Sequence, residues 1–149
     1  MTVKKVILIG SGVRETYIAK RLFIDTNGEI AKTVILTKRN PEISSYAKNI
    51  FLVNDFSLET FLCNSHIESF INKNFRDIDF AVIGPEQPLK EGFADFFESI
   101  GIRTIGPKMN LAKLETSKLY CREFLRKNRL SHLSPMWCDI SGMTKFNVY

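Results

Sequence analysis

The chain has 149 residues, the size of one ordinary domain and enough to bury a hydrophobic core. Its 44% hydrophobic and 25% charged content is typical of a globular protein, and no apolar run approaches the roughly 20 residues that span a bilayer. The three cysteines are odd in number and widely spaced, which indicates neither a disulfide framework nor a zinc site. We therefore expect a cytoplasmic protein without a metal site of its own.

The net charge of +5 is unevenly distributed along the chain. Residues 51–100 hold three Lys or Arg against nine acids, whereas residues 1–50 hold nine against four and residues 101–149 hold nine against three. A nucleic-acid surface is more uniformly basic and interleaves aromatic residues. We expect no nucleic-acid or membrane partner. The basic loops suit a small phosphorylated ligand, or they are simply solvated.

Strand and helix patterns alternate over residues 1–105. Five apolar, β-branched runs predict strands at residues 6–9, 33–36, 49–53, 80–83 and 102–105. Helical spacing of apolar residues follows the first strand and is strongest at residues 89–100, while residues 57–73 predict one interrupted helix or two short ones. Asn40-Pro41 predicts a loop. The alternation predicts an α/β domain with a doubly wound parallel sheet and helices on both faces.

The character of the chain changes after Gly106-Pro107. Asn110 predicts the N-cap of one long helix that runs to about residue 127. We therefore expect residues 1–107 to form the first domain and residues 108–149 to hold a linker helix and the start of a second.

The first candidate site is the turn Gly10-Ser11-Gly12 after the first strand, together with Arg14 and Glu15 at the start of the next helix. Glycines let the backbone approach a ligand closely, and a helix N-terminus offers N–H groups and a positive dipole end to an anion. Arg14 adds a guanidinium suited to a phosphate or carboxylate. Taken alone, the pattern predicts either a ligand loop or a merely tight turn.

This turn departs from the dinucleotide fingerprint, because Glu15 or Tyr17 stands where a third glycine is required. The second strand also lacks the acidic residue at its end that binds an NAD ribose. NAD is therefore disfavoured. NADP stays open, because Lys38 and Arg39 could hold a 2′-phosphate.

The second candidate site is the loop Gly84-Pro85-Glu86-Gln87-Pro88-Leu89 after the fourth strand. A parallel sheet places this loop at the same carboxyl edge as the first turn, where the two can face each other across the topological switch point. Pro85 and Pro88 stiffen the loop and hold the Glu86 carboxylate in a position suited to ribose hydroxyls or an amine. The alternative is that Glu86 only complements the N-terminus of the following helix.

A third motif, Leu114-Glu115-Thr116-Ser117-Lys118, lies in the predicted long helix. Glu115 and Lys118 are three residues apart, the spacing of a surface ion pair that contributes roughly 0.2–0.5 kcal/mol. From spacing alone, such a pair is the simpler interpretation.

Together these sites resemble the amino-terminal part of the phosphoribosylamine–glycine ligases, also called glycinamide ribonucleotide synthetases, of archaeal type and of the ATP-grasp superfamily. The family's Gly-x-Gly-Gly-Arg-Glu-His is matched by residues 10–16, and its Gly-Pro-Glu-x-Pro-Leu by residues 84–89. Its Gly-Pro and later Leu-Glu-x-Ser-Lys are matched by residues 106–107 and 114–118, and its Asn-Pro-Gly-Ile loop resembles residues 40–43.

The resemblance implies a pre-ATP-grasp, Rossmann-like domain in which Gly10–Glu15 and Gly84–Leu89 hold the phosphoribosyl substrate and Lys118 reaches the phosphates of ATP. It also implies an enzyme of purine biosynthesis. ATP and Mg²⁺ convert glycine into an acyl phosphate, which the amine of phosphoribosylamine attacks. The family's metal ligands would lie after residue 149, so we expect this chain to be the amino-terminal portion and inactive alone.

The chain departs from the family at three positions. Val13 replaces the second glycine of the doublet, Thr16 replaces the histidine, and Glu42 replaces the glycine of the Asn-Pro-Gly loop. Two other interpretations stay open beside the ligase. One is a non-catalytic domain that retains phosphoribosyl or nucleotide recognition, and the other is an NADP-binding domain.

Overall fold

The computed structural model describes residues 5–25, 27 and 31–137. The chain divides into two compact units, Met1–Ala112 and Lys113–Tyr149. The first unit contains the sheet and the helices that cover it. The boundary expected after residue 107 stays a prediction of the sequence.

In the described residues the sheet has five parallel strands in the order β3-β2-β1-β4-β5. The strands are β1 (Lys5–Ile9), β2 (Ala31–Leu36), β3 (Asn49–Leu52), β4 (Ile78–Ile83) and β5 (Arg103–Ile105). The central strand β1 is buried along most of its length, which accounts for its continuous apolar run. The predicted doubly wound parallel sheet is confirmed.

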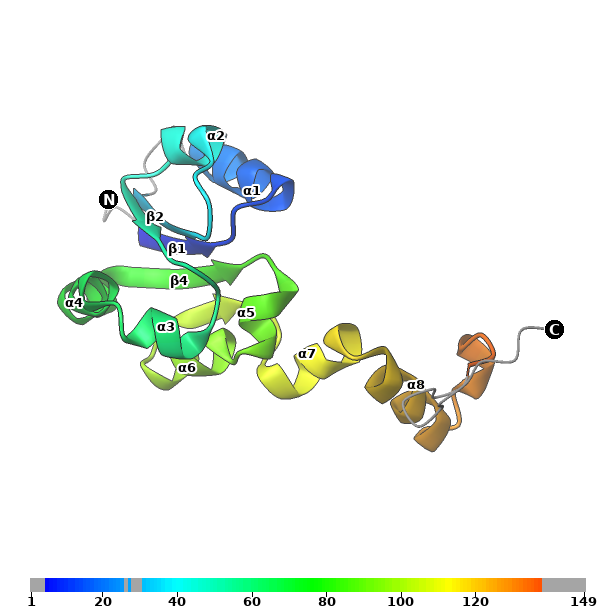
Figure 1. Cartoon of the computed structure of the whole chain (residues 1–149). Coiled ribbons are helices and arrows are strands. Elements are labelled where there is room, and N and C mark those ends of the chain that lie inside the picture. The colour runs from blue at the N-terminus through cyan, green and yellow to red at the C-terminus, as the bar shows by residue number, and fades with distance from the viewer. Residues whose placement is uncertain (1–4, 26, 28–30, 138–149) are drawn as a thin grey trace. The chain divides into compact units, whose positions relative to one another are not determined.

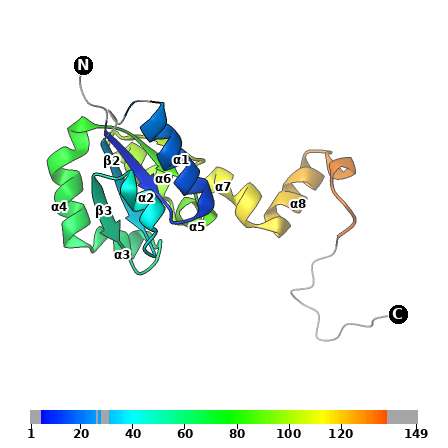
Figure 2. The ribbon, with the colours of Figure 1, turned by 90° about the horizontal axis from the view of Figure 1, so that it is seen from above.

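Helices cover both faces of the sheet (Figure 1). One face carries α1 (Val13–Ile24) and α2 (Pro41–Ser45), which lie side by side in Figure 2. The other carries α3 (Leu58–Leu62), α4 (Ser65–Asn74), α5 (Glu86–Lys90) and α6 (Phe93–Ser99), with a 3₁₀ turn, η1 (Phe75–Asp77), leading into β4. Each face has its own core, because side chains alternate across a strand.

The larger core lies under α3 to α6. Its centre is a group of phenylalanines, in which the rings of Phe61 and Phe93 have centroids 4.9 Å apart. The smaller core lies under α1 and α2, where Ala19 and Ile43 pack against β1. Both cores are buried and together fix the carboxyl edge of the sheet.

Two helices of the first unit differ from the sequence-based expectation. Residues 89–100 do not form one helix, because Gly92 adopts a left-handed φ of +85° and separates α5 from α6. Asn40-Pro41 begins α2 rather than a loop, since the Asn40 side chain accepts a hydrogen bond from the Ile43 N–H at 3.1 Å. Residues 57–73 form two helices, one of the two alternatives that the sequence leaves open.

The single long helix expected from Asn110 to about residue 127 is wrong. The chain forms α7 (Met109–Thr116) and α8 (Lys118–Lys127), and Asn110 lies inside α7. Ser117 is extended and caps α8, its Oγ accepting a hydrogen bond from the Tyr120 N–H at 3.2 Å. A 3₁₀ turn, η2 (Ser131–Leu133), follows. Among all the residues described, no helix has both the length and the apolar character needed to cross a membrane.

Candidate functional site

The two glycine loops meet at the carboxyl edge of the sheet, beside the point where the strand order reverses. β1 lies between β2 and β4, so the loop after β1 borders the loop after β4. The Gly84 N–H donates to the Ile9 carbonyl at 3.1 Å, and the Gly10 N–H donates to the Ile35 carbonyl at 3.0 Å. The structure thus brings together the two candidate sites that the sequence analysis pairs.

Glu15 lies behind both loops rather than on their open side. The residue is only 4% exposed, and its Oε2 accepts a hydrogen bond from the Gly12 N–H at 2.7 Å. A Cβ atom at Gly10 would lie 2.5 Å from Glu15 Cγ, and one at Gly84 would overlap the Glu15 carboxyl group. Both glycines are therefore required by the Glu15 side chain, whatever else they bind.

Arg14 bridges the two loops from their open side. Its Nη1 donates to the Gly84 carbonyl at 2.7 Å, and its Nη2 lies 3.4 Å from Glu86 Oε1. Both side chains are about half exposed, so the ion pair is accessible to a ligand. Hydrogen bonds from its own backbone N–H and from Arg14 hold the pKa of the Glu86 carboxyl below its usual range.

The rest of the second loop anchors it to the protein. Pro85 occupies the N-cap position of α5, and Pro88 and Leu89 are buried. Leu89 belongs to the larger core and packs close to Gly106. Pro88 and Leu89 therefore hold Glu86 in place and do not form the open surface of the site.

A network of hydrogen bonds joins the first turn to residues that follow β2. The Thr37 N–H donates to Ser11 Oγ at 3.0 Å, and Asn40 Nδ2 donates to the Ser11 carbonyl at 3.0 Å and to Thr16 Oγ1 at 3.1 Å. Thr16 Oγ1 in turn donates to the Gly12 carbonyl at 2.9 Å. Thr37 is not identifiable as a site residue from the sequence. For Asn40 the signals are the resemblance of residues 40–43 to an Asn-Pro-Gly-Ile loop and the preference for Asn before Pro as a helix cap.

The open side of the first turn is bordered by exposed side chains on α1. Val13 is 75% exposed and Tyr17 64% exposed, so the valine in place of glycine meets no steric conflict within the chain. A hollow of about 220 Å³ adjoins the turn. It is lined by Val13, Thr16, Tyr17, Lys20, Asn40 and Glu42.

The other candidate residues belong to other segments of the chain. Lys118 is the first residue of α8, in the second unit, and is exposed. Lys38 and Arg39 are exposed after β2. Within the described parts of the chain, no group of three or more His, Cys, Asp or Glu side chains could hold a metal ion.

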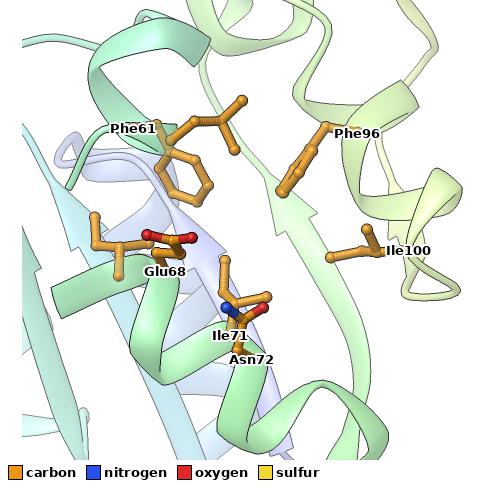
Figure 3. Close-up of a pocket in the computed structure, with 8 residues that line it drawn as sticks. Phe61, Glu68, Ile71, Asn72, Phe96 and Ile100 are labelled. Atoms are coloured by element: carbon orange, nitrogen blue, oxygen red, sulfur yellow. The ribbon is translucent and has the colours of Figure 1, made fainter. Parts of the chain in front are cut away.

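A larger cavity, of about 420 Å³, lies away from these loops, between α3, α4 and α6 (Figure 3). Its walls are apolar and include Phe61, Phe96 and Ile100, and α4 contributes Glu68 and Asn72. No residue of either glycine loop lines it. The candidate site is therefore the polar edge of the sheet and not this apolar cavity.

Solved structures with a similar fold are domains of larger enzymes. The biotin carboxylase domain of 2-oxoglutarate carboxylase from Hydrogenobacter thermophilus, solved with MgADP, ADP and bicarbonate, matches with a TM-score of 0.55 at 19% identity. The match covers 85% of this chain and 28% of that one. The biotin carboxylase subunit of a pyruvate carboxylase matches with a TM-score of 0.53 at 19% identity, over 84% of this chain and 27% of that one. The fold is thus the α/β fold of a domain in these carboxylases.

Sequence comparison identifies the family. The profile described as phosphoribosylglycinamide synthetase, N domain, matches residues 4–115, and the chain belongs to this family. It is 36% identical over 123 residues to the phosphoribosylamine–glycine ligase of Methanocaldococcus jannaschii. The aligned region covers 83% of this chain and 26% of that relative. The corresponding ligase of Methanopyrus kandleri is 33% identical, over 97% of this chain and 28% of the relative.

These matches confirm the resemblance inferred from the sequence motifs. The chain spans little more than a quarter of the length of these curated relatives.

Proposed function

We propose that this chain is the amino-terminal, substrate-binding part of an ATP-dependent carbon–nitrogen ligase that joins glycine to 5-phosphoribosylamine in purine biosynthesis. The proposal rests on the family match and on relatives that are named phosphoribosylamine–glycine ligases. A cytoplasmic location and small-molecule partners belong to the same proposal.

The observation that carries the proposal is the contact between the two loops. Arg14 links the turn after β1 to the loop after β4, and the exposed residues Gly12 and Val13 at the start of α1 lie beside this link. A helix N-terminus attracts a phosphate group, while Arg14 and Glu86 supply a cation and a carboxylate for the remaining polar groups of a sugar phosphate. In this proposal the phosphoribosyl group lies across the two loops.

The proposal assigns ATP to a residue outside the two glycine loops. Lys118 is exposed and its ammonium suits the phosphates of ATP as a point charge. The described residues do not provide a Mg²⁺ site, because they contain no cluster of three or more potential ligands. Any metal ligands of the ligase are therefore expected outside the residues described.

A thermal-shift titration with ribose 5-phosphate, ATP and NADP tests the substrate assignment. At ten times its dissociation constant, a ligand that binds only the folded state adds roughly 1.4 kcal/mol of stability. We expect ribose 5-phosphate to raise the melting temperature, and Arg14→Ala or Glu86→Ala to abolish the increase. Arg21→Ala is the matched control, because it removes an exposed arginine of the same helix that pairs with Asp25.

Stabilisation by NADP alone would overturn the assignment in favour of a dinucleotide-binding domain. A non-catalytic binding domain would give the same ribose 5-phosphate result as the ligase. The two are separated by measuring ADP release that depends on glycine and phosphoribosylamine, with the longest polypeptide that the gene encodes. Absence of that activity would contradict the ligase and leave a binding domain.

A further inference from the structure

A basic cavity of about 380 Å³ lies on the other side of the first unit, at the edge where the strands begin. Lys5 and Asn49, the first residues of β1 and β3, line it, and Thr33 of β2 contributes to it. One face of α4 lines its other side. Because the glycine loops follow the ends of the strands, this cavity is separate from the proposed substrate site.

The ionisable side chains that line this cavity are all basic. Lys5, Lys48, Lys73 and His66 all line it, and none of the nine described lining residues is acidic. Lys5 Nζ pairs with Asp77 at 2.9 Å, outside the lining. The basic group is notable because residues 51–100, which supply α4, are acidic overall.

Helix α4 separates two different surfaces. His66, Ser69 and Lys73 recur at i, i+3 and i+7, so they share the face that borders the basic cavity. Glu68 and Asn72 instead border the apolar cavity of Figure 3. The lysine and the glutamate of this helix are therefore directed to different hollows.

Hydrogen bonds fix part of the cavity wall. Asn49 Nδ2 donates to Thr33 Oγ1 at 3.2 Å, and Asn74 Nδ2 donates to the Phe70 carbonyl at 2.8 Å. The hydroxyl of Ser69 and the imidazole of His66 add polar groups that can bind oxygen atoms. The wall thus combines fixed amides with longer cationic side chains.

We propose that this cavity is a second binding site, which takes a small phosphate-bearing anion. Lys48 and Lys73 border one hollow that has no acidic residue in its lining, and both ammonium groups attract a dianion placed between them. Lysine binds phosphate as a point charge, and hydroxyl and imidazole groups add hydrogen bonds. The volume lies in the range of about 300–1,000 Å³ that is usual for small-molecule sites.

Titration of the whole chain with inorganic phosphate at constant ionic strength, followed by backbone amide NMR, tests the proposal. We expect saturable shifts at Asn49, Ser69 and Lys73, and an affinity reduced at least about tenfold in Lys48→Ala/Lys73→Ala, because two of the point charges are lost. The control Lys90→Ala/Lys127→Ala removes the same charge from exposed positions outside the cavity and should leave the affinity unchanged. Lys73→Gln keeps a long polar side chain and should also weaken binding.

A parallel titration with glycerol 3-phosphate identifies the source of the phosphate group. Tighter binding than inorganic phosphate indicates a phosphorylated metabolite, and equal binding indicates the free ion. Arg14→Ala should leave the shifts at this cavity intact. Non-saturating shifts, equal affinity in the double variant and its control, or loss of binding in Arg14→Ala would overturn the proposal.

Discussion

The carboxyl group of Glu15 occupies the space into which side chains at positions 10 and 84 would otherwise extend. Buried carboxylates need hydrogen-bond partners, and the Gly12 N–H provides one at 2.7 Å. The Glu15 side chain thus connects the backbones of two loops that are distant in the sequence. At the scale of single residues, the site requires glycine at positions 10 and 84, because a Cβ atom there would collide with Glu15.

We expect Gly84→Ala to lower the free energy of unfolding by about 1–3 kcal/mol, the usual cost of overpacking. The added methyl group would overlap the Glu15 carboxyl group. Urea denaturation of Gly84→Ala, Glu15→Ala and the double variant measures the coupling, and the double variant should lose less than the sum of the single losses.

Gly101→Ala is the control for this cycle. Its added methyl group meets no atom within 4 Å, so its cost comes from a positive φ and should not be relieved by Glu15→Ala. Additive losses for positions 15 and 84 would show that the two groups do not compete for space.

The pH titration of Glu86 gives a second prediction at this scale. Its folded-state pKa is lowered, so the carboxylate adds stability above the pKa of the unfolded chain, and this stability is lost as the pH falls through the folded pKa. In Arg14→Ala we expect the pKa to rise but to stay below the ordinary value. The first cause of the shift, a hydrogen bond from the Glu86 backbone N–H, remains.

NMR titration of the side-chain carboxyl carbon measures this pKa directly. Arg21→Ala, at the other end of α1, should leave it unchanged. An unaltered Glu86 pKa in Arg14→Ala would mean that the ion pair across the loops does not form in solution.

At the scale of elements, short helices are positioned by their caps. Asn40 caps α2 and also donates to Ser11 and Thr16, so one side chain starts a helix and holds the neighbouring turn. Ser57 caps α3 by accepting a hydrogen bond from the Thr60 N–H, and its hydrogen bonds join it to Asp55, Thr60 and Phe61 rather than to the glycine loops. These two caps are similar in chemistry and differ in what else they touch.

We expect Ser57→Ala to lower the free energy of unfolding by about 0.5–2 kcal/mol, the usual cost of losing one N-cap, and Asn40→Ala to cost at least as much, because it also removes the hydrogen bonds to Ser11 and Thr16. Only Asn40→Ala should also weaken ribose 5-phosphate binding, because it releases the Ser11 carbonyl and the Thr16 hydroxyl. Chemical denaturation measures the first effect and a thermal-shift titration the second. Equal binding by both variants would show that this network of hydrogen bonds does not position the turn.

The order of strands and helices could be predicted from the sequence because buried strands and amphipathic helices have different periodicities. The helix breaks were harder to predict. Gly92 interrupts a continuous apolar stripe, and Ser117 caps a helix inside a segment whose composition is helical throughout. Local composition permits both outcomes, and the backbone conformation at one residue decides between them.

The pairing of the two glycine loops followed from the topology of a parallel sheet. The burial of Glu15 could not be predicted in this way, because Gly84, which leaves space for its carboxyl group, belongs to a loop that is distant in the sequence. The bonds of Asn40 to Ser11 and Thr16 likewise join segments more than 20 residues apart. Such contacts depend on the tertiary arrangement, which no local pattern contains.

At the scale of the whole molecule, the first unit holds both cores. Ala112 is 2% exposed and packs in the larger core, whereas Lys113 and the residues after it belong to the second unit. Helix α7 crosses this boundary. The first unit therefore contains all the residues needed for a folded α/β domain.

We expect a chain shortened to end at Thr116, which keeps α7 whole, to unfold cooperatively at a melting temperature close to that of the full chain. It should also retain stabilisation by ribose 5-phosphate, because both glycine loops lie in the first unit. Circular dichroism with and without the ligand measures both properties. A broad, non-cooperative transition would show that the second unit is needed to complete the fold.

The space that Glu15 occupies also restricts which substitutions the protein can accept during evolution. A larger residue at position 10 or 84 collides with the existing side chain, while a smaller residue at position 15 leaves the Gly12 N–H without its partner and opens a hollow. Single mutational steps away from this trio are therefore disfavoured, whichever position changes first. Among descendants of a common ancestor, we expect positions 10, 15 and 84 to be inherited together or replaced together.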